Sequence, residues 1–171
     1  KEDEWLNLSL NITDPDGTNS YVSNWQIKDG SQWVTKKTNT DNLQLTQEFV
    51  GKEVRVQVTH TDNRGDQTVF VSSATNAVQN TNDLPTGQLV INGIAKIGET
   101  LTLDTSTIQD EDGPTSLSFS YTWYRSSDGD NWTAISNSTG SSYTIVDADA
   151  HHEIKAKVTY TDAFSKKETV E

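Results

Sequence analysis

The sequence predicts an all-β protein of two tandem β-sandwich domains. Apolar and polar residues alternate with a period of two, as in strands that pack one face on a core, and no segment keeps a helical stripe for three turns. Turn signals recur roughly every eight to twelve residues, which favours many short strands. The chain also carries nearly the same sequence twice, and a repeat of about a hundred residues is a whole domain.

The alternating segments define the expected strands. In chain order they are residues 5–12, 54–60, 89–91, 101–103, 117–123, 143–145 and 154–160. Tight-turn dipeptides such as Asp29-Gly30 and Asp128-Gly129 punctuate the chain. We expect Trp25 and Trp123 to lie on an early central strand of each copy and to fill its core.

The register of the repeat sets the domain boundaries. Matched features are Asp14-Pro15-Asp16-Gly17 with Asp110-Glu111-Asp112-Gly113, Trp25 with Trp123, Trp33 with Trp132, and residues 54–62 with residues 154–162. We predict a first domain over residues 1–79 that lacks its first strand, and a second over residues 88–171 that lacks part of its last strand. The linker, residues 80–87, is short and polar and contains Pro85, which predicts a semi-rigid joint.

The composition of the chain argues against several classes of function. The chain has 25 acidic and 13 basic residues, a formal net charge of -12, which argues against binding to a phosphate backbone. No apolar run is long enough to suggest membrane insertion, and there is no cysteine for a disulfide or a thiolate nucleophile. No motif for a catalytic centre is present, so we expect a protein that is not an enzyme.

Several segments carry a family resemblance. They are residues 80–87, residues 93–104, Asp110 to Gly113, Tyr121 to Gly129, residues 143–149 and residues 158–162. This set is similar to the bacterial immunoglobulin-like or cadherin-like tandem repeats of large surface adhesins, of the RTX or biofilm-associated type. The first copy matches less well, and His151-His152 departs from the pattern that Gly51-Lys52 keeps.

The resemblance implies two tandem immunoglobulin-like β-sandwich domains joined end to end. It further implies an extracellular, non-catalytic extender segment at a bacterial cell surface, which projects a distal binding domain. The expected partners are neighbouring repeats of the parent chain and a cell-surface glycan or protein. An unpaired sheet edge in the first domain would also permit strand exchange between copies.

Two acidic motifs are candidate Ca²⁺ half-sites. Asp14 and Asp16 in the first copy, and Asp110 and Asp112 in the second, place two carboxylates ahead of a glycine turn. Such pairs can point into one concavity, where Ca²⁺ prefers several oxygen ligands. The alternative is a tight turn in which the aspartates accept hydrogen bonds from backbone amides.

A third candidate site lies at the linker. Asn82 and Asp83, together with Asp62 or Glu99, could share a cation that stiffens the joint, an arrangement that the resemblance to cadherin-like modules implies. The same resemblance makes Ca²⁺ the expected ion.

Trp33 and Trp132 leave two interpretations open. Both follow polar turns, so they either pack on a sheet edge or remain partly exposed as ligand contacts. The second interpretation would make the chain a recognition module that binds carbohydrate or peptide through these rings.

Overall fold

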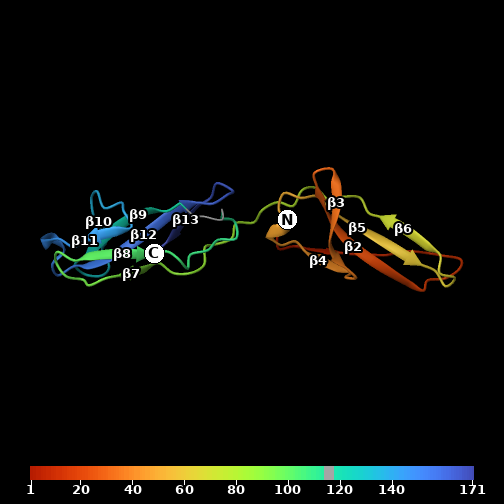
Figure 1. Ribbon diagram of the computed structural model, residues 1–171, viewed down its shortest axis with the longest axis horizontal. Helices are drawn as coiled ribbons and strands as arrows, with labels where there is room; N and C mark the ends of the chain where they lie inside the picture. Colours follow the sequence, from red (N-terminus) through yellow and green to blue (C-terminus); the bar gives the residue numbers. More distant parts are fainter. Residues whose placement is uncertain (114–117) are drawn as a thin grey trace. The chain divides into compact units, whose positions relative to one another are not determined.

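The computed structural model describes residues 1–113 and 118–171 (Figure 1). The chain divides into two compact units, Lys1–Thr81 and Asn82–Glu171. Strands β1 to β6 lie in the first unit and β7 to β13 in the second. Within each unit the paired strands are all antiparallel. Within the described residues no helix is long and apolar enough to cross a membrane.

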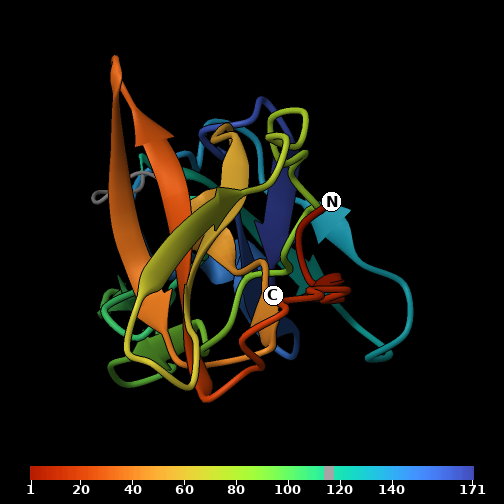
Figure 2. The same ribbon diagram turned by 90° about the vertical axis from the view of Figure 1, so that its right-hand side faces the viewer.

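The first unit contains a four-stranded and a two-stranded sheet. The larger has the order β3-β2-β5-β6, with bounds β2 Ser20–Asp29, β3 Gln32–Thr38, β5 Val54–Thr61 and β6 Gln67–Val71. The smaller pairs β1 Trp5–Asn7 with β4 Asn42–Gln44, and the 3-10 turn η1 Gln47–Phe49 follows it. Figure 2 shows β2 and β3, in orange, as neighbouring strands of one hairpin. At its tip Gly30 has φ 60°, a conformation that glycine adopts without strain.

The second unit repeats this plan with one more strand. Its larger sheet has the order β10-β9-β12-β13, with bounds β9 Ser120–Ser126, β10 Thr133–Ala134, β12 Glu153–Thr161 and β13 Lys167–Val170. Its smaller sheet has the order β11-β8-β7, with bounds β7 Val90–Asn92, β8 Thr100–Asp104 and β11 Ser142–Thr144. The 3-10 turn η2 Asp147–Asp149 precedes β12.

Each unit forms its core around a tryptophan of the larger sheet. Trp25 lies opposite Val56 in the first unit, and Trp123 lies opposite Ala156 in the second. Both rings are buried, as expected, and both donate Nε1–H at 2.9 Å to a backbone carbonyl, that of Thr40 or of Gly140. Along β5 every second residue is buried, so the alternation in the sequence does mark the core-facing side chains.

The expected strands are partly confirmed. The structure has strands at residues 54–61, 100–104, 142–144 and 153–161, close to the predicted ranges. The segment 5–12 pairs only as far as Asn7, while Leu8 and Ile12 pack against the core without a ladder. Alternation reports which side chains face the core, not which backbone groups pair. The predicted strand 117–123 begins at Ser120 in the structure, and residue 117 lies outside the described residues.

The two units differ at their sheet edges. In the first, residues 72–78 run back along β5, where the Ser72 and Thr75 amides donate to Val56 and Val54 at 2.9 and 2.8 Å. Val78 then completes the core. In the second, β7 adds an edge to β8 that the chain does not supply in the first unit.

The boundary between the units falls inside the segment expected to be the linker. The Thr81 amide donates to Glu2 of the first unit, whereas Thr86 exchanges two backbone hydrogen bonds with Gln109 of the second. Residues 82–87 therefore belong with the second unit.

Candidate cation-binding loops

The first acidic motif forms a tight turn. The Asp16 amide donates to Asp14 Oδ1 at 2.9 Å, and the Gly17 amide donates to the Asp14 carbonyl at 3.0 Å. Gly17 has φ 84°, which a β-carbon would oppose. The capping role that we weighed as the alternative is therefore present.

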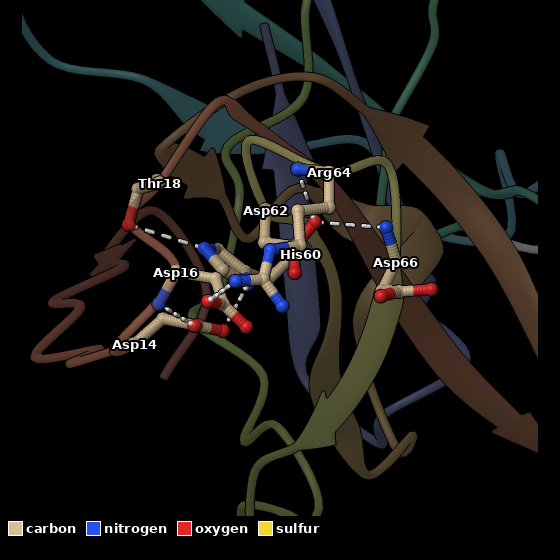
Figure 3. A network of polar contacts seen from close by, with 7 residues as sticks. All are labelled: Asp14, Asp16, Thr18, His60, Asp62, Arg64 and Asp66. Carbon is tan, nitrogen blue, oxygen red and sulfur yellow. Dashed lines mark hydrogen bonds and ion pairs between the residues drawn. The ribbon is translucent and has the colours of Figure 1, made fainter.

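Asp62 brings a third carboxylate to this turn. It follows β5, is only 4% exposed, and its Oδ1 accepts the amides of Arg64 and Asp66, both at 2.8 Å. One oxygen each from Asp14, Asp16 and Asp62 lies within 4.8 Å of the others, so the three could hold a metal ion (Figure 3).

Two basic side chains already lie at this triad. A guanidinium nitrogen of Arg64 is 2.9 Å from Asp16 Oδ1, and Nδ1 of the buried His60 is 3.8 Å from Asp14 Oδ2 (Figure 3). The other ring nitrogen of His60 shares a hydrogen bond of 3.1 Å with Thr18. A metal ion here would sit beside a guanidinium and meet its repulsion.

The second unit repeats the backbone of this site. The Asp112 amide donates to Asp110 Oδ1 at 2.9 Å, and the Gly113 amide to the Asp110 carbonyl at 3.0 Å. Asp162 Oδ1 accepts the amides of Phe164 and Lys166 at 2.8 and 2.7 Å. These are the bonds of the first unit at matched positions.

The side chains around the second loop are different. Tyr160 takes the place of His60 and donates its hydroxyl to Asp110 Oδ2 at 2.5 Å. Burial raises the pKa of the Tyr160 hydroxyl well above its ordinary value, and the bond to Asp110 and the charges of Glu168 and Asp162 raise it further. The loop therefore concentrates negative charge around a neutral phenol.

Asn82 and Asp83 join this second loop. Asn82 donates its side-chain amide to Glu168 at 3.1 Å, and the Asp83 amide donates to Asp112 Oδ2 at 2.7 Å. The structure thus brings both predicted linker residues to acidic side chains of the second unit.

Glu99, predicted to share that site, is not brought to it. Glu99 is exposed and precedes β8, whereas Asp110 and Asp112 follow β8 in the chain. A strand of this length separates its two ends by about 15 Å. The prediction took Glu99 as a residue at the end of its domain that faces the linker; Glu99 lies just before β8, where its carbonyl accepts the Ile145 amide at 3.0 Å.

Two residues of the second loop escaped the sequence analysis. Asp162 could have been found, because the repeat matches it to Asp62. Glu168 had no such signal: its counterpart in the first copy is Thr68, and each pairs with the matched residue of the neighbouring strand, Tyr160 or His60.

The two surface tryptophans are each covered by a cation of the same unit. The Arg55 guanidinium lies 4.2 Å from the ring centre of Trp33, and the Lys155 ammonium lies 4.8 Å from that of Trp132. Trp132 also donates Nε1–H to the Gly129 carbonyl at 3.1 Å. One face of each half-buried ring is thus in use, which favours the packing interpretation.

Comparisons with known proteins identify no family, so the proposals on function below rest on the sequence, the fold and these loops. A scan against protein-family models found no match for the chain, and a search of curated proteins found none either.

Proposed function

We propose that this chain is a non-catalytic extender segment of a large bacterial surface adhesin, built from two tandem immunoglobulin-like β-sandwich domains. The main support is that the same domain occurs twice, with the same hydrogen bonds at matched positions. These are the bond from the core tryptophan to a carbonyl, the bond within the Asp14 or Asp110 turn, and the bonds from loop amides to Asp62 or Asp162. Copies of one small domain add length in a chain, and the resemblance of residues 80–162 to adhesin repeats supports this role.

We further propose that the cation of the acidic loops is Ca²⁺. The triad in the first unit offers only carboxylate oxygens, and the loop in the second offers carboxylates and an amide side chain. Hard cations prefer such all-oxygen sets, whereas Zn²⁺ selects nitrogen and sulfur ligands.

Small-angle scattering tests the extender role. With Ca²⁺ present we expect a maximum dimension close to that of two domains placed end to end. When EDTA removes the ion, we expect the distribution of interatomic distances to broaden. A compact envelope in both conditions would contradict the proposal.

The alternative function, a recognition module for carbohydrate or peptide, needs a separate test. Titration of glycans or peptides against Trp132 fluorescence, with Trp132→Phe as the control, would reveal it as a saturable shift that the variant lacks. We expect no such shift, because Lys155 already covers one face of the ring.

A further inference from the structure

We propose that the first unit binds a neutral carbohydrate on the outer face of its small sheet, with the indole of Trp5 as the surface on which one sugar ring stacks. This binding function is additional to the extender role and does not depend on it. Its support comes from the exposure of Trp5, from the amide side chains around it, from the groove beside it, and from the matched face of the second unit.

The indole of Trp5 is exposed. All five tryptophans lie in the described part of the chain, and Trp5 alone among them is exposed, at 56%. Trp25 and Trp123 are buried in the two cores, whereas Trp33 and Trp132 are half-buried, each with a cation over one face. Within the described residues no cation or aromatic ring lies over Trp5, and its Nε1–H donates to no acceptor. Both the apolar ring and its polar N–H are therefore available to a ligand.

The side chains beside Trp5 on this face are carboxamides. In the ladder between β1 and β4, Trp5 pairs with Gln44, and Asn7 pairs with Asn42. The middle residue of each strand packs against the core, so the first and last residues of both strands point to the outer face. Within the described residues no hydrogen bond occupies these three amide side chains. A carboxamide both donates and accepts, as a sugar hydroxyl does, so these groups can bind hydroxyls at the edge of a ring stacked on Trp5.

A groove of about 490 Å³ runs beside Trp5. Its uncharged polar lining residues are Thr38, Thr40, Asn42, Gln44 and Thr46. The charged residues Lys37 and Glu48 also line it, and their charges sum to zero. An aromatic ring bordered by a few polar groups is the usual composition of a small-ligand site, and balanced charges favour a neutral ligand.

The matched face of the second unit shows that the fold does not require these residues. At the four matched positions β8 and β11 carry only small hydroxyl side chains, Thr100, Thr102, Ser142 and Thr144. The hydroxyls of Thr100 and Thr144 share a hydrogen bond of 3.0 Å. Such side chains are ordinary on a solvated strand face. The same sheet therefore forms without an indole or a carboxamide on this face, and ligand binding gives a reason for their presence in the first unit.

A carbohydrate fits this face better than a protein or a nucleic acid does. A specific protein interface buries about 800 Å² on each partner around an apolar centre, whereas here one indole is surrounded by polar side chains. An extended peptide pairs with the edge of a sheet, and this site is a face. The formal net charge of -12 opposes a phosphate backbone. A pyranose ring has an apolar face of C–H groups and a rim of hydroxyls, which matches an indole bordered by carboxamides.

Titration of the full chain with neutral oligosaccharides tests the proposal. The panel contains linear hexasaccharides of glucose, galactose, mannose and N-acetylglucosamine. We expect at least one of them to bind saturably in calorimetry at concentrations up to about 10 mM. The bound sugar should also reduce the quenching of tryptophan fluorescence by iodide, because Trp5 is the indole most accessible to that ion. Trp5→Ala should weaken binding by at least about tenfold, and Gln44→Ala by about two- to tenfold.

The second unit supplies a matched replacement for the whole face. The variant Trp5→Thr/Asn7→Thr/Asn42→Ser/Gln44→Thr carries the second unit's residues and should abolish binding while the first unit stays folded. Trp132→Phe serves as the control and should change the affinity by less than about twofold, because Trp132 lies outside the proposed site.

Two results would overturn this inference: absence of saturable binding to the whole panel, and binding that the fourfold variant leaves unchanged. Neither result bears on the extender role, which small-angle scattering tests separately. Hydrogen exchange of the β5 amides shows whether the first unit is folded in each variant. Trp5→Ala, at an exposed position, keeps the test decisive if the fourfold variant unfolds.

Discussion

Beside the 3-10 turn of each unit, the two copies have different side chains at three matched positions, all of them buried except the half-buried Arg125. The second unit has Arg125, Tyr143 and Asp149, and the first has Ile27, Leu43 and Phe49. The matches are set by the ladders, since Arg125 pairs with Ile154 as Ile27 pairs with Val54, and Tyr143 pairs with Leu101 as Leu43 pairs with Leu6. The same three positions of the fold are therefore occupied by a polar triad in the second unit and by an apolar triad in the first.

The polar triad is a closed network. Asp149 accepts the Tyr143 hydroxyl at 2.5 Å, an Arg125 nitrogen at 3.0 Å and the Val146 amide at 2.9 Å. Burial acts to raise the pKa of Asp149, but these three donors outweigh it and hold the pKa below its usual range. All three positions differ together between the two copies, and a partial set would leave a buried polar group without its partner.

The largest expected effect comes from breaking the network at its centre. Asp149→Ala leaves Arg125 and Tyr143 without their shared acceptor and should destabilise the second unit by about 3–5 kcal/mol. Hydrogen exchange of the β12 amides measures this, and the β5 amides of the first unit serve as the internal control. A loss below about 1 kcal/mol would mean that the network contributes little.

Exchange of the whole triad should have a smaller effect of opposite sign. The variant Arg125→Ile/Tyr143→Leu/Asp149→Phe carries the first unit's residues and is expected to be neutral or more stable by about 1–4 kcal/mol. The same β12 amides report it. A variant as unstable as Asp149→Ala would show that the surrounding residues, and not only the triad, distinguish the two cores.

Alkaline pH should also separate the two units. Burial, the hydrogen bond to Asp149 and the charge of Asp149 raise the pKa of Tyr143 to about 12. The pKa of Tyr160 is raised as well. A raised pKa means that the stabilisation is complete below the unfolded value of about 10 and is lost as pH rises toward the folded value.

The first unit has Leu43 and His60 at these positions. Its Tyr21, whose pKa is raised by the hydrogen bond to Asp41, is exposed, so the first unit should lose less stability over this range. Urea unfolding at pH values between about 9 and 11.5 would show one transition weakening more than the other. Tyr143→Phe should remove part of the difference, and an equal loss in both units would contradict the assignment.

Much of the fold was predictable because the relevant signals are local. The alternation along residues 54–60 and the matched tryptophans identified the central strands and the two cores. Strand β2 was harder to delimit, because its buried face includes the polar Ser23 and Gln26, which bond to Thr40 and Gln57. Apolar alternation cannot reveal a polar residue whose partner comes from a distant segment of the chain.

The candidate loops show the same limit more strongly. The Asp14 and Asp110 turns were visible as short motifs, but Glu168 and Asn82 are 86 residues apart and meet only through the fold. Asp149 likewise lies in the local turn η2. Its role as the buried acceptor depends on Arg125, 24 residues away.

The smallest expected effect concerns the covered tryptophans. Lys155→Gln removes the cation above Trp132, and Arg55→Gln removes the one above Trp33. Each should cost about 0.5–1 kcal/mol, since the pairs lie at partly exposed sites. Arg55 also donates to Gln26 at 2.8 Å, so its loss should be the larger of the two. Denaturant titration measures both, and a greater loss from Lys155→Gln would show that its further contacts, the ion pair with Glu171 and the approach to the Tyr124 ring, outweigh the contact with Trp132.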